Sequence, residues 1–254
     1  MSLRVETQGK GAPLLLIHGW GMHGGMWSQI AAQLSLSHQV YSLDLPGHGG
    51  STTCTPYDLD TVVHRLKDRF DEPLTLCGWS LGGQVALRWA QLYPAQITKL
   101  ILVSTTPCFV QQEGWSCAMD GETLQVFAES LLQNHAQTLR RFLALQVRGS
   151  EHERELLSDL RAQLFAHGEP DVTALQGGLG ILRDTDLRAF LPQLLQPTLL
   201  LAGERDTLTP LAAMAYMENL MPASRLASIK GAAHAPFLSH QQIFMEHLTS
   251  FLNE

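Results

Sequence analysis

A serine with a glycine two residues away on each side is the clearest chemical signal in this chain. Ser80 is the central residue of the pentapeptide 78–82, Gly-Trp-Ser-Leu-Gly, which follows a short apolar run at 74–77 and precedes a segment with helical spacing of apolar residues. A sharp turn between a buried strand and a helix presents such a serine and leaves no room for side chains at the glycines. A bare pentapeptide of this kind also occurs by chance, so the flanking strand and helix support the prediction of Ser80 as a nucleophile.

A serine hydroxyl is a poor nucleophile near neutral pH, so it needs a base and a carboxylate that orients the base. His234 and Asp206 each lie just after an apolar run that can form a strand. Glu204 is a rival acid, but the spacing Gly-x-x-Asp-x-x-x-Pro favours Asp206. Serine, aspartate, histidine is the chain order of the α/β-hydrolase triad and differs from that of other serine hydrolase folds. We therefore predict Ser80, Asp206 and His234 as a catalytic triad.

Two backbone amides are candidates for stabilising a negatively charged intermediate. The amide of Leu81 lies at the start of the helix expected after Ser80, where N–H groups lack helical partners. The turn 18–21, His-Gly-Trp-Gly, follows another apolar run and resembles the turn that supplies the second donor in α/β-hydrolases. We predict that the N–H groups of Trp20 and Leu81 form an oxyanion hole and that the Trp20 ring forms a wall of the pocket.

The alternation of apolar runs and amphipathic segments predicts an α/β fold with a mainly parallel sheet and helices on both of its faces. The expected strands are 14–17, 40–43, 74–77, 100–103, 198–202 and 225–229, and the expected helices are 26–34, 59–70, 81–92, 211–221 and 241–252. Between 107 and 184 the sequence reads instead as several helices with glycine and proline punctuation. We predict a helical cap at 107–184, inserted into an α/β-hydrolase core formed by 1–106 and 185–254.

Composition narrows the class of protein. The chain has 254 residues, of which 45% are hydrophobic, and its 17 basic and 24 acidic residues give a net charge of −7, which argues against a general nucleic-acid binder. No His, Cys or carboxylate pair has metal-ligand spacing on one helix face, so we expect no metal and no other cofactor. An apolar signal core and a membrane-spanning run are both absent from the sequence, so we expect a cytoplasmic, monomeric protein. We expect unpaired thiols at the four scattered cysteines, Cys54, Cys77, Cys108 and Cys117.

The whole chain resembles one family of α/β-hydrolases, the pimeloyl-acyl-carrier-protein methyl ester esterases of biotin synthesis. The resemblance rests on the blocks 16–21, 44–49, 78–83, 141–146, 177–182 and 232–240. Blocks 141–146 and 177–182 are the more informative, because they fall in the expected cap, where sequences diverge fastest with substrate. The resemblance implies that the acyl site is lined by Trp20, Ser80, Leu81, Phe142, Leu143, Ala144, Leu145, Gln146 and His234.

The reaction implied by the resemblance is hydrolysis of a methyl ester on a pimeloyl chain that is attached to acyl carrier protein. A carrier protein is strongly acidic, so an esterase of net charge −7 needs a local basic surface to bind it. The expected cap carries candidate docking residues: Arg140, Arg141 and Arg148 lie in a stretch (136–149) without an acidic residue, and Arg154 and Arg161 follow among the acidic residues of 151–159. The alternative is a solvated helix face with internal ion pairs, and both interpretations stay open.

Two other functions remain open at this stage. A broad-specificity carboxylesterase for short acyl esters is the nearest alternative, because nothing in the predicted triad selects a leaving group. A non-catalytic ligand-binding protein with the same fold is a more distant one, since the triad is complete in sequence. Dehalogenases and epoxide hydrolases fit less well because they use an aspartate where this chain has Ser80.

Overall fold

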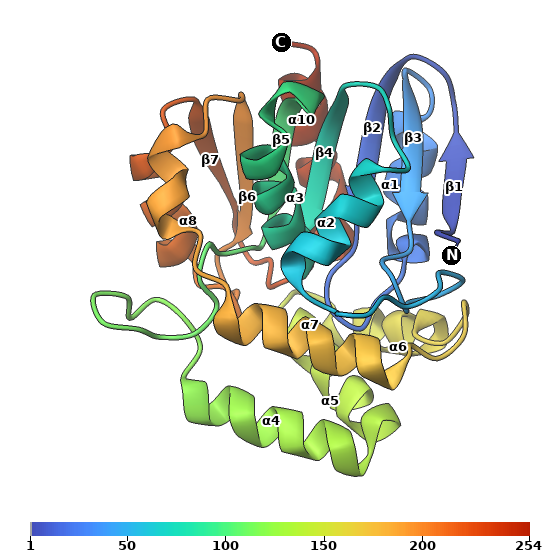
Figure 1. Cartoon of the computed structure of the whole chain (residues 1–254), viewed down its shortest axis with the longest axis vertical. Helices are drawn as coiled ribbons and strands as arrows, with labels where there is room; N and C mark the ends of the chain where they lie inside the picture. The colour runs from blue at the N-terminus through green and yellow to red at the C-terminus, as the bar shows by residue number, and fades with distance from the viewer. Residues whose placement is uncertain (1) are drawn as a thin grey trace.

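The computed structural model describes residues 2–254, and a seven-stranded sheet forms its centre (Figure 1). The strands lie in the order β1-β3-β2-β4-β5-β6-β7; β1 is antiparallel to β3, and all the other neighbours are parallel. Their bounds are β1 Val5–Gln8, β2 Ala12–Ile17, β3 His38–Leu43, β4 Leu74–Trp79, β5 Ile97–Val103, β6 Thr198–Gly203 and β7 Ser224–Ile229. Every residue of β4 and β6 is buried, as expected for central parallel strands that are covered on both faces.

Helices cover both faces of this sheet. In Figure 1, α2 and α3 lie in front of the strands, and α1 and α10 lie behind them. The helices outside the 107–184 segment are α1 Ser28–Leu34, α2 Leu59–Lys67, α3 Leu81–Leu92, α8 Leu211–Leu220, α9 Pro236–Ser239 and α10 Gln241–Leu252, and short 3-10 helices span η1 Gly24–Trp27, η2 Pro94–Gln96 and η3 Arg188–Gln193. The buried rings of Trp27 and Phe237 stack with centroids 4.1 Å apart, which ties the start of the α1 segment to the chain before α10.

Four further helices lie beyond the carboxyl ends of the strands, at the bottom of Figure 1. They are α4 Gly121–Gln133, α5 His135–Val147, α6 Glu153–Gln163 and α7 Val172–Asp184. All four come between β5 and β6 in the chain, where the sequence predicted a helical insertion. We call residues 107–184 the cap; the division of the chain into cap and core remains our interpretation.

The sheet agrees with the sequence prediction except at its edge. All six expected strands are present, but β1 was not predicted, because its four residues are only half buried or exposed and carry no apolar run. The expected helix at 26–34 begins as the 3-10 helix η1 and becomes α-helical only at Ser28. All four cysteines are free thiols, as expected. Within residues 2–254, no helix is both long enough and apolar enough to cross a membrane.

Candidate functional site

Ser80 occupies a strained turn between β4 and α3. Its backbone angles are φ 56° and ψ −117°, a region that residues other than glycine rarely adopt. The turn is held by hydrogen bonds from the Ser80 N–H to the Val103 carbonyl, 2.9 Å, and from the Thr105 hydroxyl to the Ser80 carbonyl, 2.6 Å. A Cβ at Gly82 would lie 2.5 Å from the carbonyl oxygen of Ile17, so α3 can approach β2 only with glycine there. The sharp turn has the shape that the sequence predicted.

His234 and Asp206 form a buried pair at the carboxyl edge of the sheet. Asp206 follows β6 and His234 follows β7, and Nδ1 of His234 lies 2.8 Å from Oδ2 of Asp206. The other carboxylate oxygen accepts the backbone N–H groups of Leu208 and Thr209 at 2.9 and 3.0 Å. The Thr209 hydroxyl donates to Oδ2 at 2.8 Å. The carboxylate is therefore fixed in position by its own loop.

Hydrogen bonding keeps the buried Asp206 ionised. Burial by itself raises the pKa of this carboxyl, but the neighbouring His234 and the hydrogen bonds from His234 and Thr209 outweigh it, so the pKa lies below its ordinary value. Because a carboxylate can only accept, the proton of the imidazole resides on Nδ1. Nε2 of His234 is buried and has no hydrogen-bond partner within residues 2–254, so its lone pair is available to a substrate or to the Ser80 hydroxyl.

The turn that follows β2 lies directly against the turn that holds Ser80. A Cβ at Gly19 would lie 3.2 Å from the Cβ of Ser80. The backbone N–H groups of Trp20 and Leu81 donate to no acceptor in the described chain. Leu81 is the first residue of α3, where the helix dipole favours negative charge. Two unused donors are thus available on the two turns beside the serine.

His18 joins the first of these turns to the chain that follows β3. Its Nε2 accepts the N–H of Leu45 at 2.9 Å, and its Nδ1 donates to the carbonyl of Gly19 at 2.7 Å. Burial lowers the pKa of His18 well below the ordinary histidine value, so the ring stays neutral and both hydrogen bonds persist at neutral pH. The ring therefore fixes the backbone immediately before Trp20.

An apolar cavity lies between Trp20 and the cap. It is lined by Trp20, Phe109, Met119, Thr123, Leu124, Phe127, Phe142, Leu145, Leu179, Leu182 and Leu208. The Trp20 ring packs edge-on against Phe142 and Phe127, with centroids 5.0 and 5.4 Å away, and its Nε1–H donates to the Leu175 carbonyl at 2.8 Å. A Cβ at Gly178 would lie 2.7 Å from this ring, so glycine in α7 lets the cap pack onto Trp20.

The cavity contains only part of the acyl site implied by the resemblance. Trp20, Phe142 and Leu145 line it. Six others do not line it, and their role in binding substrate remains a prediction: Ser80, Leu81, Leu143, Ala144, Gln146 and His234. Sequence reasoning missed Phe127 and Leu208, because each reaches the cavity through the packing of the cap on the core, and no local sequence pattern shows this.

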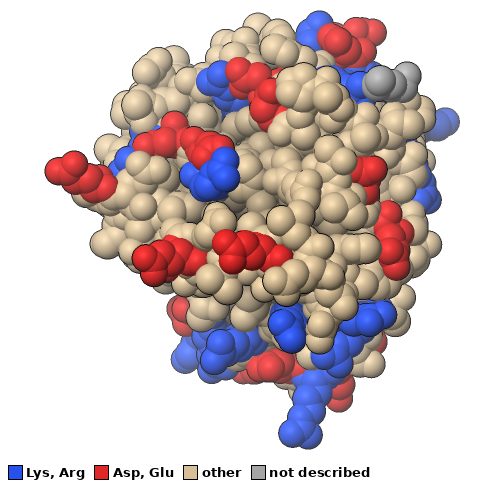
Figure 2. Space-filling model, turned by 60° about the horizontal axis from the view of Figure 1, so that its bottom comes forward, with Lys and Arg blue, Asp and Glu red and all other residues tan. Residues whose placement is uncertain are grey.

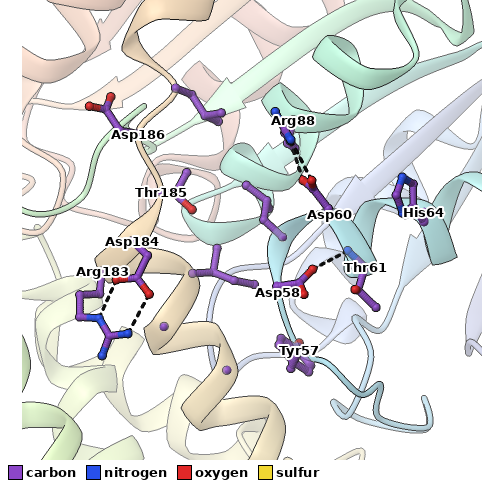
Figure 3. Close-up of a pocket in the computed structure, with 15 residues that line it drawn as sticks. Tyr57, Asp58, Asp60, Thr61, His64, Arg88, Arg183, Asp184, Thr185 and Asp186 are labelled. Atoms are coloured by element: carbon purple, nitrogen blue, oxygen red, sulfur yellow. Dashed lines mark hydrogen bonds and ion pairs between the residues drawn. The ribbon is translucent and has the colours of Figure 1, made fainter.

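A separate hollow lies on the outer side of α7, next to α2 (Figure 3). Its charged side chains already pair with one another: Arg88 with Asp60 at 2.6 Å, and Arg183 with Asp184 at 2.7 Å. None of the predicted catalytic residues lines it. Trp20, a predicted oxyanion residue, lines the apolar cavity instead, so that cavity is the candidate acyl site, and Ser80, Asp206 and His234 lie outside its lining.

Comparison with known proteins agrees with the fold and the order of these elements. Residues 12–241 match the family model described as alpha/beta hydrolase fold. The chain belongs to the α/β-hydrolase family. A relative from Nitrosomonas europaea is 42% identical over 96% of this chain and 97% of its own, and one from Xylella fastidiosa is 43% identical over 98% of both; each is named pimeloyl-acyl-carrier-protein methyl ester esterase. The solved structure of an esterase from Exiguobacterium antarcticum superposes with a TM-score of 0.92 at 25% identity, covering 99% of this chain and 96% of that one.

The cap of this α/β-hydrolase carries several exposed arginines. The cap arginines Arg140, Arg141, Arg148, Arg154 and Arg161 are all exposed, and none forms an ion pair within the part of the chain that the structure describes. The Arg140 guanidinium lies 5.8 Å from the centre of the Phe165 ring. Figure 2 shows basic side chains along the lower edge of this face, with acidic side chains among them. The absence of internal ion pairs at these arginines argues against the alternative of a self-paired helix face.

Proposed function

We propose that this chain is a serine carboxylesterase that hydrolyses the methyl ester of pimeloyl-acyl-carrier protein to methanol and free pimeloyl-acyl-carrier protein, a step of biotin synthesis. The observation that carries the proposal is the 42–43% identity, over nearly the whole length of both chains, to relatives that bear this name. The hydrogen-bonded pair of His234 and Asp206, the turn that presents Ser80 and the apolar cavity lined by Trp20 support it.

In the first half of the proposed reaction, Ser80 Oγ attacks the ester carbonyl while Nε2 of His234 takes the hydroxyl proton. The carbonyl oxygen becomes negatively charged and accepts the N–H groups of Trp20 and Leu81, each of which lowers the barrier by about 3 kcal/mol. Asp206 stabilises the positive charge on the imidazole. His234 then returns the proton to the methoxy oxygen, methanol leaves, and the acyl group remains on Ser80.

In the second half, a water molecule gives a proton to Nε2 of His234 and attacks the acyl carbonyl. The same two amides stabilise the second tetrahedral intermediate. Its collapse breaks the bond to Ser80 Oγ, which regains a proton from His234, and releases the free carboxylic acid. One water is consumed and one methanol is formed in each cycle.

The position of the cavity also suggests how the acyl chain and the carrier-linked end of the substrate are oriented. The apolar chain would lie between Trp20 and Phe142, which its methylene groups can contact without leaving a polar group unpaired. Leu124 and Leu179 line both this cavity and an open pocket between α4 and α7. The end linked to the carrier would leave the protein there, in the cap, where exposed arginines such as Arg140 and Arg141 can attract the acidic carrier. Because the proposed substrate is bound to a carrier protein, we expect the enzyme to act in the cytoplasm.

Growth without biotin tests the proposal. Cells that lack this esterase should grow on biotin-free medium when they express the wild-type chain and should fail to grow when they express Ser80→Ala. Purified wild-type protein should release methanol from the carrier-bound methyl ester and react with a fluorophosphonate probe, whereas Ser80→Ala should do neither. Soluble wild-type protein that reacts with the probe but supports no growth and releases no methanol would contradict the assignment of the substrate.

A broad-specificity carboxylesterase for short acyl esters is the second candidate. It is favoured by the close superposition on the esterase from Exiguobacterium antarcticum. Hydrolysis of short soluble esters together with inactivity toward the carrier-bound ester would support this candidate. A folded wild-type protein that does not react with the probe would instead favour a non-catalytic ligand-binding role.

A further inference from the structure

Two imidazoles and a carboxylate come together at a place remote in sequence from the proposed triad. One nitrogen of His23, one nitrogen of His167 and one oxygen of Asp44 all lie within 4.8 Å of one another. His23 precedes η1 and Asp44 follows β3, whereas His167 lies in the turn between α6 and α7. Two of the three groups therefore belong to the core and the third belongs to the cap.

One ring nitrogen of His23 has the hydrogen bond that is typical of a metal ligand. Its Nε2 lies 2.9 Å from the carbonyl oxygen of Gln163, which can only accept, so Nε2 carries the proton. The lone pair is then on Nδ1, where it accepts a 3.1 Å hydrogen bond from the N–H of Gly25 that a metal ion would have to displace. Metal-bound imidazoles commonly donate their other N–H to a carbonyl or a carboxylate, which fixes the tautomer and the orientation of the ring.

His167 supplies a buried nitrogen without a partner. Its Nδ1 forms no hydrogen bond within residues 2–254 and lies 3.8 Å from Oδ2 of Asp44. Its ring lies beside that of His23, with centroids 4.2 Å apart and planes tilted by 33°. Buried polar groups usually have a partner, so an unpaired nitrogen that faces a carboxylate and a second imidazole indicates a missing ligand.

Asp44 is oriented by the backbone and keeps capacity to bind a cation. Its Oδ1 accepts the N–H of Gly24 at 2.7 Å, and its Oδ2 accepts the N–H of Gly50 at 2.9 Å. The guanidinium of Arg4 approaches Oδ2 only to 3.6 Å. A carboxylate has about four lone-pair positions, so these contacts leave room for a bond to a metal ion.

We propose that His23, Asp44 and His167 form a binding site for a transition-metal ion of the Zn²⁺ class. Two imidazoles and one carboxylate suit Zn²⁺, with water in the fourth position. Metal–ligand bonds of about 2.0–2.2 Å require the ligand atoms to approach more closely than they do here, and the His167 ring can turn because no described hydrogen bond holds it. The sequence predicted no metal because the three ligands come from separate segments and share no helix face.

Bound metal would tie the cap to the core, because His167 is the only cap residue in the cluster and the other two ligands lie in the core. Zn²⁺ should therefore slow protease cleavage within the cap as well as raise the melting temperature. Both effects are independent of esterase activity, so the proposal can fail while the proposed function stands.

Metal titration of the full-length, untagged protein tests the site. All variants carry Cys117→Ser, because the thiol of Cys117 is the one cysteine that is only half buried and could bind zinc itself. Calorimetry with Zn²⁺ and visible absorption with Co²⁺ should show one saturable ion per chain. His167→Ala should weaken the affinity by at least about tenfold. His247→Ala, which removes an equally half-buried histidine from α10, should leave it unchanged.

His167 is the residue to change because its side chain is only partly buried and has no hydrogen bonds, so its loss should not unfold the protein. Loss of saturable Zn²⁺ binding and of the Zn²⁺-dependent protease protection in His167→Ala alone would support the proposal. Absence of saturable binding in the parent protein would overturn it. Equal affinity in the parent and in His167→Ala would also overturn it, because the ion would then bind elsewhere.

Discussion

The carboxylate of Asp206 is held more tightly than the two groups with which it is proposed to act. It accepts hydrogen bonds from Leu208, Thr209 and His234, whereas Nε2 of His234 has no hydrogen-bond partner within residues 2–254. The fixed carboxylate sets the tautomer of the imidazole. This arrangement leaves the two groups that must exchange a proton free to do so when the substrate binds.

Replacing Asp206 should therefore damage catalysis far more than it damages the fold. Asp206→Asn keeps the size of the side chain but offers an N–H where the imidazole needs an acceptor, so the ring would adopt the wrong tautomer. We expect kcat for a soluble p-nitrophenyl ester to fall by about 10⁴. Glu204→Gln is the matched control, because Glu204 lies two residues away and is exposed. A loss of activity in the control and not in Asp206→Asn would make Glu204 the acid.

The effect of Asp206→Asn on the free energy of unfolding should depend on pH. The folded-state pKa of Asp206 lies below the unfolded value of about 3.9, so the ionised carboxylate stabilises the fold above that pH, and this stabilisation is lost as the pH falls through the folded-state pKa. Urea unfolding should show a stability difference between wild type and Asp206→Asn that narrows below about pH 4. A difference that stays constant through this range would mean that the carboxylate ionises alike in both states.

At the scale of secondary structure, the junction of β4 and α3 depends on how closely α3 approaches β2. A Cβ at Gly82 would meet the carbonyl oxygens of Ile17 and His18 at 2.5 and 2.6 Å, and these residues lead into the turn that carries Trp20. Any side chain at position 82 would push α3 and this turn apart. The two proposed oxyanion donors would then no longer lie at the spacing that one oxygen atom needs.

Two glycine-to-alanine substitutions test this dependence. Gly82→Ala should lower the free energy of unfolding by about 1–3 kcal/mol and reduce kcat, because overpacking separates two buried elements. Gly180→Ala in α7 has no atom within 4 Å of the new Cβ, so it should raise the free energy of unfolding by about 0.5–1 kcal/mol. Urea unfolding and ester hydrolysis measure both variants. Full activity and stability in Gly82→Ala would show that the junction tolerates a wider spacing.

Secondary structure was predictable from the sequence where burial is complete, and less so where it is partial. The central strand β4 is apolar and bounded by the glycine turn, so its sequence is distinctive. The edge strand β1 has no such run, since only part of each side chain is buried. Ser80, Asp206 and His234 could be proposed because their roles require these residue types after successive strands. The cavity wall at Phe127 and the cluster at His167 depend on how the cap packs on the core, which no local spacing encodes.

At the scale of the whole molecule, the protein has a negative net charge but carries several exposed arginines on its cap. The chain carries a net charge of −7, yet five exposed cap arginines have no ion-pair partner within residues 2–254. An approaching acidic protein responds to the local field over about 10 Å at 0.1 M salt, so Arg140, Arg141 and Arg148, in a stretch (136–149) without an acidic residue, can attract it although the cap as a whole is acidic. Binding of the proposed carrier-bound substrate should therefore depend on these arginines, whereas binding of a small ester should not.

Charge reversal on the cap separates these two kinds of substrate. Arg140→Glu and Arg141→Glu should each lower kcat/KM for the carrier-bound ester by about tenfold at low salt, with a smaller loss at high salt, because steering by exposed charges is screened. Hydrolysis of p-nitrophenyl esters should stay within about twofold, since neither side chain lines the cavity. Lys10→Glu makes the same change in net charge near the amino end of β2, and it should leave both activities unchanged. Equal losses of activity on both substrates would mean that the arginines support the structure of the cap. A loss in Lys10→Glu as large as that in the arginine variants would assign the effect to net charge.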